Sequence, residues 1–143
     1  MKRSKFNLSH TQLLTGRMGQ LIPIGLVEVL PGDTIQHAAQ ALIRAAPLAT
    51  PPMHPVRIDI RHFFVPNRIL WDEWEDFITG GPDGNNTDSP PYMNAASAIG
   101  SLQDFFGIPP GNTLDYSALP FRAYNMIFNE YYRDQDLQEP LRS

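Results

Sequence analysis

One short stretch of the chain alternates strictly between apolar and polar residues. Its apolar side holds Val56, Ile58 and Ile60, and its polar side holds two arginines and an aspartate. A period of two residues is typical of a β-strand with one buried face. The pattern therefore predicts a strand over residues 56–60. His62 continues the apolar side, where we expect it in the core or at its rim, hydrogen-bonded to the backbone.

Two earlier stretches show weaker strand patterns. Residues 21–30 are largely apolar, but Pro23 would remove a ladder hydrogen bond, so an edge strand, a bulge or a strand start is favoured there. Residues 37–46 form a second apolar run whose alanine-rich composition also suits a helix, and the prolines around it favour a strand. Together these stretches predict strands over residues 21–66.

Helical spacing replaces alternation after Pro66. Apolar residues at intervals of four, three and one positions define one helix face: Leu70, Trp74, Phe77 and Ile78. This spacing predicts a helix over residues 68–79, ended by Gly80-Gly81-Pro82. We expect Trp74 to pack in the core and Trp71 to lie at its rim, with Phe77 contributing to helix docking.

A second helix is predicted over residues 119–132, with Pro120 in its first turn. An aromatic stripe follows its helical period: Phe121, Tyr124, Phe128 and Tyr131. Core packing and a partner interface both account for such a stripe, because tyrosine suits surfaces that are apolar at one end and wet at the other. Residues 83–92 are a loop by composition. Residues 95–106 suggest a short helix, in which Ser101 and Asp104 have capping-box spacing.

Composition supports a loop-rich, mainly β chain with helical insertions. Fourteen prolines and ten glycines among 143 residues are many for a compact helical domain, and the lack of cysteine excludes disulfides and thiolate metal sites. No apolar run approaches the roughly 18 residues of a membrane span, and no secretory signal follows the basic start. We divide the chain into an arm (residues 1–20), strands (residues 21–66) and a helical and loop insertion (residues 67–143).

Basic residues gather near the start of the chain, although the net charge is −4. They are Lys2, Arg3, Lys5 and, further along, Arg17. A solvated terminus explains them, and so does an arm that contacts phosphate, since such arms gain affinity by releasing counterions from nucleic acid.

No catalytic, metal or cofactor site stands out. Asp72, Glu73, Glu75 and Asp76 crowd one side of the predicted helix, where a solvated face accounts for them more simply than acid–base catalysis. His54 and His62 would lie about 26 Å apart along a strand, too far to share one ion. We therefore expect no cofactor and no enzymatic activity. The alternatives are a hydrolase that uses the acid cluster, and a carbohydrate- or protein-binding module that uses Trp71 or the loop 83–92.

Three long blocks resemble the start of the major capsid protein of the Microviridae, small single-stranded DNA bacteriophages, and the gokushovirus branch most closely. They are FNLSHTQLLTGRMGQLIPIGLVEVLPGDTIQH (residues 6–37), HPVRIDIRHFFVPNRILWDEWEDFITGGPDG (residues 54–84) and ALPFRAYNMIFNEYYRDQDL (residues 118–137). The blocks occur in the family's order. They therefore carry more weight than any short motif.

The resemblance implies a viral jelly roll with large insertions that assembles with icosahedral symmetry around single-stranded DNA. It implies as partners other copies of the chain, scaffolding, spike and small DNA-binding proteins, and the genome, but no membrane. It places the protein in the virion and, during assembly, in the host cytoplasm. Because members of the family are several times longer, we expect an N-terminal portion: a partial jelly roll of first strands plus two or three helices, with an incomplete barrel.

Overall fold

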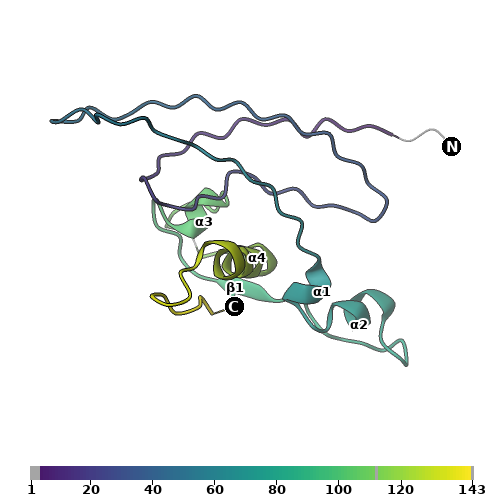
Figure 1. Ribbon diagram of the computed structural model, residues 1–143. Helices are drawn as coiled ribbons and strands as arrows, with labels where there is room; N and C mark the ends of the chain where they lie inside the picture. Colours follow the sequence, from purple (N-terminus) through teal and green to yellow (C-terminus); the bar gives the residue numbers. More distant parts are fainter. Residues whose placement is uncertain (1–3, 112, 143) are drawn as a thin grey trace. The chain divides into compact units, whose positions relative to one another are not determined.

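The computed structural model describes residues 4–111 and 113–142 (Figure 1). Short helices and one two-stranded sheet follow one another along the second half of the chain. The order is α1 (Asn67–Leu70), α2 (Trp74–Thr79), β1 (Tyr92–Asn94), α3 (Leu102–Phe105), β2 (Asp115–Ser117), α4 (Leu119–Ile127) and the π-helix η1 (Phe128–Tyr132). The chain divides into two compact units. The first, the helical unit, comprises Met1–Leu26 and Phe64–Ser143, and the second, the extended unit, is Val27–Phe63.

The extended unit contains no helix and no hydrogen-bonded strand, and all of its residues are described. The strands predicted over residues 37–46 and 56–60 are therefore not formed in this chain, and neither is the helix considered for residues 37–46. The strand predicted over residues 21–30 is also absent. A strand is stabilised by a ladder partner and by cover for its apolar face, and the structure provides neither here. The partial jelly roll stays a prediction.

The helix predicted over residues 68–79 is interrupted. Trp71 has an extended backbone, with φ −151° and ψ 115°, which ends α1 after one turn. Helix α2 begins three residues later and ends at Gly80, whose φ of +86° is the left-handed conformation that glycine adopts without strain. The Gly80 N–H donates to the Asp76 carbonyl at 2.8 Å. The predicted end of the helix is thus confirmed, but its continuity was wrong.

Residues 92–117 contain a small two-stranded antiparallel sheet that the sequence pattern did not predict. Strands β1 and β2 pair antiparallel, with Met93 opposite Tyr116. Helix α3 covers only part of the predicted helix over residues 95–106. The Ser101 hydroxyl accepts from the Asp104 N–H at 3.3 Å, as the capping spacing predicted, and the helix ends before Gly107.

The helix predicted over residues 119–132 is confirmed as α4 followed directly by η1, with Pro120 in the first turn. At Phe128 the hydrogen bonding lengthens by one residue, and the Arg133 N–H donates to the Phe128 carbonyl at 2.8 Å, as in a π-helix. Among the described residues, the buried apolar ones all belong to the helical unit: Trp71, Phe105, Ala118 and Phe121. Among the helices of the described ranges, none is long and apolar enough to cross a membrane.

Candidate interaction surfaces

Three aromatic side chains from α1–α2 pack against one another. The Trp71 ring lies 5.2 Å from Phe77 and 6.2 Å from Trp74, measured between ring centroids, and Trp74 lies 6.2 Å from Phe77. These spacings fall in the favourable range for aromatic pairs. The predicted residues Trp71, Trp74 and Phe77 are thus brought together, and we call them the tryptophan cluster.

The order of burial within the tryptophan cluster is the reverse of the prediction. Trp71 is only 6% exposed, whereas Trp74 is half-buried and Phe77 is 40% exposed. The cause is the extended backbone at Trp71, which shifts the helical phase that placed Trp74 at the centre. Ile78, which the helical spacing placed on the buried face, is also largely exposed.

Two polar contacts hold the tryptophan cluster in place. The Trp71 Nε1–H donates to the Glu73 carboxylate at 2.6 Å, which satisfies the polar atom of a buried indole. The Arg122 guanidinium of α4 donates through Nη1 to the Leu70 carbonyl at 2.9 Å. That carbonyl lies in the last turn of α1, where backbone acceptors have no partner inside the helix. Arg122 therefore joins α1 to α4.

The acid cluster lies on an exposed surface. Asp72, Glu73, Glu75 and Asp76 are all exposed, and the part of the chain that the structure describes holds no group of three or more metal-ligating side chains. A polar hollow of about 500 Å³ lies beside them, lined in part by Trp71, Ser89 and Arg122. Because the Trp71 ring is covered by its aromatic neighbours, it presents no open face on which a sugar could stack. The carbohydrate-binding alternative therefore gains no support here.

A second aromatic cluster forms around the start of α4. Phe121 is 7% exposed and packs 4.9 Å from Phe106 and 5.4 Å from Tyr116 between ring centroids. Phe105 and Ala118 are also buried. We call this group the Phe121 cluster. It joins α4 to α3 and to β2, and neither Phe106 nor Tyr116 was singled out from the sequence.

The predicted aromatic stripe changes environment along its length. Phe121 is core, and Tyr124 is half-buried with its hydroxyl donating to the Leu21 carbonyl at 2.9 Å. Burial raises the pKa of the Tyr124 hydroxyl. Phe128 is half-buried, and Tyr131 is 63% exposed. The wider π turn at η1 rotates the last part of the stripe away from the α-helical phase.

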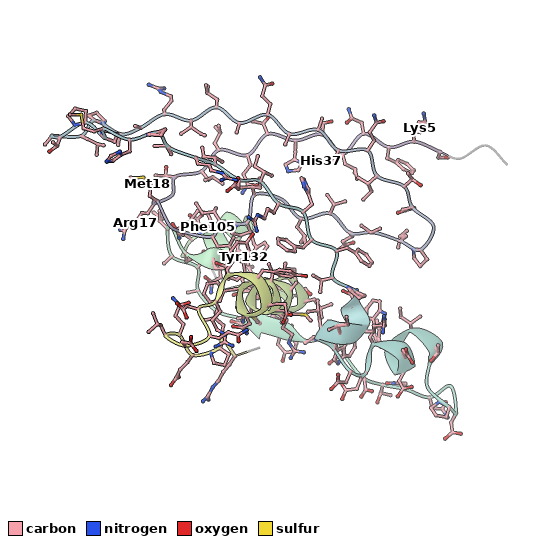
Figure 2. All side chains as sticks on the ribbon, in the orientation of Figure 1. Lys5, Arg17, Met18, His37, Phe105 and Tyr132 are labelled. Atoms are coloured by element: carbon pink, nitrogen blue, oxygen red, sulfur yellow. The ribbon has the colours of Figure 1, made fainter. Side chains whose placement is uncertain are left out.

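The two described basic residues of the proposed arm set do not lie together. Lys5 and Arg17 are exposed and lie well apart in Figure 2, while Lys2 and Arg3 lie outside the described residues. Arg17 belongs to a turn in which the Gln20 N–H donates to its carbonyl at 3.3 Å. Between them, the Gln12 amide donates to the Phe105 carbonyl at 3.0 Å and anchors the arm to α3.

Two asparagines that sequence analysis missed hold the last residues of the chain. The Asn125 amide donates to the Arg142 carbonyl at 2.8 Å. Asn129 makes two contacts of 2.8 Å with Leu141, donating to its carbonyl and accepting from its N–H. The asparagines are four positions apart, so they share a helix face. The four-residue spacing could have marked the two asparagines as a pair on one helix face. It does not predict which groups their amides bind.

Comparison with known proteins decides the family. The family described as capsid protein (F protein) matches residues 1–142. The chain belongs to this phage capsid protein family. It is 42% identical to capsid protein VP1 of Chlamydia phage 1 and 43% identical to capsid protein VP1 of Bdellovibrio phage phiMH2K, over 99% and 94% of the chain. The resemblance to the Microviridae major capsid protein is confirmed.

More distant relatives extend the same assignment. Capsid protein F of Escherichia phage G4 is 28% identical over 92% of the chain, and the match covers 30% of that protein. The chain spans 26% of the length of each of the two VP1 relatives.

Proposed function

We propose that this chain forms part of the structural coat protein of a small icosahedral single-stranded DNA phage, which assembles with copies of itself into the virion shell. The observation that carries the proposal is the capsid-family match over residues 1–142. Such a protein acts by making repeated interfaces rather than by transforming a substrate. The exposed acid cluster accordingly serves as a solvated surface.

The extended unit supports assembly because it presents apolar side chains without cover. Twelve of its large apolar residues are exposed: Val27, Val29, Leu30, Ile35, Leu42, Ile43, Leu48, Met53, Val56, Ile58, Ile60 and Phe63. Burying one such side chain contributes about 1.5–3 kcal/mol. In this proposal, residues 21–66 become jelly-roll strands when partner strands from the same coat protein or a neighbouring copy complete their ladders.

The exposed end of the aromatic stripe is a second proposed contact. Tyr131 and Met126 are both exposed in the described structure, next to the half-buried Phe128. Tyrosine and methionine are enriched in protein–protein interfaces. We assign this surface to contacts between neighbouring coat proteins, whereas Trp71, Trp74, Phe77, Phe121 and Tyr124 serve mainly to dock the helices of one chain.

Genome contact is assigned to the basic residues of the arm. Lys5 and Arg17 are exposed, and Lys2 and Arg3 complete the proposed set. Each phosphate neutralised releases counterions, so such contacts weaken as salt concentration rises. Scaffolding, spike and small DNA-binding proteins are the further partners in this proposal, and assembly takes place in the host cytoplasm.

The test is assembly of the complete coat protein that contains this sequence, observed by negative-stain electron microscopy and sedimentation. We expect shells from the parent protein, and loss of shells with Ile58→Asp, because a charge on the apolar side of residues 56–60 opposes burial. The matched control is the double variant Arg57→Gln/Asp59→Asn on the polar side, which should still assemble. Shells that form equally well with Ile58→Asp would refute the role of this stretch, and a parent protein that never assembles would refute the function.

A further inference from the structure

Two histidines of the extended unit meet across 25 positions of sequence. Their Nε2 atoms lie 3.4 Å apart, and their rings pack edge to face with centroids 4.2 Å apart. Both side chains are exposed. His37, labelled in Figure 2, begins the apolar run over residues 37–46, and His62 follows the alternating stretch. The two exposed imidazoles thus face each other through their Nε2 atoms. Neither helix docking nor the proposed coat function requires this contact.

We propose that His37 and His62 form a two-histidine binding site for a divalent transition metal ion of the zinc, nickel and copper class. Imidazole nitrogen is a preferred ligand of these ions. With zinc–nitrogen bonds of about 2.0–2.1 Å, two ligands of a tetrahedral site lie about 3.3 Å apart, which is close to the separation seen here. Because both rings are exposed, rotation about their side-chain bonds can direct both nitrogens at one ion.

A hydrogen bond between the two Nε2 atoms, 3.4 Å apart, requires a nitrogen lone pair on one of the rings. A neutral nitrogen is the form that binds metal, and the ion takes the place of the shared proton. Elsewhere in the same segment, Arg57 and Asp59 pair with each other at 3.1 Å.

The site would act as a clip within the extended unit. Within the described ranges no third side chain joins the two histidines as a ligand group, so water completes the coordination and the affinity is modest. Bound metal would hold residues near His37 beside residues near His62. That link closes the intervening loop without any backbone ladder, and it favours the folded form by mass action. The inference stands apart from the proposed coat function.

Titration of the 143-residue chain with Zn²⁺ alone, followed by calorimetry and by the histidine ring resonances in NMR spectra, tests the site. We expect one ion per chain, with shifts confined to His37 and His62. His37→Gln and His62→Gln should each weaken binding at least about tenfold, because one ligand of two is lost. His54→Gln is the matched control: it removes an exposed histidine of the same unit and should leave the affinity unchanged.

Tryptophan fluorescence of the helical unit checks that each variant keeps its fold. The proposal is overturned if the parent chain binds no Zn²⁺, if binding survives the double variant His37→Gln/His62→Gln, or if His54→Gln weakens it equally.

Discussion

The helical unit buries a few of its apolar side chains, whereas the extended unit buries none. In the helical unit, Trp71 and Phe121 are almost fully covered by rings from neighbouring helices and strands. In the extended unit, Val56, Ile58 and Ile60 follow a clear strand pattern and yet stay exposed. A helix satisfies its own backbone and needs only a neighbour for one face. A strand needs partners for both its backbone and its apolar face, so a strand pattern alone does not form a strand.

The largest effect should come from removing the centre of the Phe121 cluster. Phe121→Ala deletes a ring that is 7% exposed and leaves Phe106 and Tyr116 without their shared neighbour. Substitutions of this kind cost about 3–5 kcal/mol. With so few buried residues, we expect loss of cooperative unfolding in a urea titration of the chain. A variant that unfolds at the same urea concentration as the parent would show that the helical unit does not depend on this core.

A smaller effect should separate the two tryptophans. Trp71→Ala removes a buried ring and its hydrogen bond to Glu73, and we expect a loss of about 3 kcal/mol in the free energy of unfolding. Trp74→Ala removes a half-buried ring and should cost about half as much. Urea unfolding followed by circular dichroism measures both. Equal losses, or a larger loss for Trp74→Ala, would restore the burial order expected from helical spacing alone.

Tyr124→Phe should cost about 1 kcal/mol at neutral pH, because it removes the hydrogen bond to the Leu21 carbonyl. The pH dependence is more specific. Burial raises the pKa of Tyr124 in the folded chain, so the folded state favours the neutral hydroxyl. Its contribution is fully present below the ordinary tyrosine pKa of about 10 and is lost as pH rises through the raised folded value.

The stability difference between the parent and Tyr124→Phe should therefore change only above about pH 10. Unfolding of both proteins at several pH values up to 11 measures it, and subtracting one from the other removes the titration of the remaining tyrosines. A difference that stays constant through pH 11 would indicate that the hydroxyl is exposed in solution.

The smallest effect on the free chain should come from the extended unit. Ile58→Thr keeps a β-branched side chain but removes apolar surface that is already exposed, so the free energy of unfolding should change by less than about 0.5 kcal/mol. Denaturant unfolding of the chain alone measures this, with Phe121→Ala as the contrasting variant. A loss above 1 kcal/mol would show that Ile58 is buried within the chain in solution, which would remove the contrast between the two units.

What could be predicted from sequence follows the same division. The helix over residues 119–132 was found because its period, its proline and its length agree within one element. The capping contact of Ser101 and the stop at Gly80 were found because they depend on neighbouring residues alone. Sequence patterns therefore predicted the features that depend only on residues close together in the chain.

The failures each involve something that a linear pattern does not contain. The break at Trp71 depends on the backbone angles of one residue, and it exchanged the expected positions of the two tryptophans. Strands β1 and β2 are three residues long, too short for a period of two to be recognised. The strand pattern over residues 56–60 depends on partners, and the contact between His37 and His62 depends on tertiary structure.

The Asn129 contact with Leu141 uses only main-chain atoms of its target. Any residue with a backbone N–H can make these hydrogen bonds from position 141. Substitutions there should therefore keep both bonds, except substitution by proline, which has no N–H. The two hydrogen bonds to residue 141 therefore do not depend on the side chain at that position. They do depend on Asn129, because its amide group supplies both the donor and the acceptor.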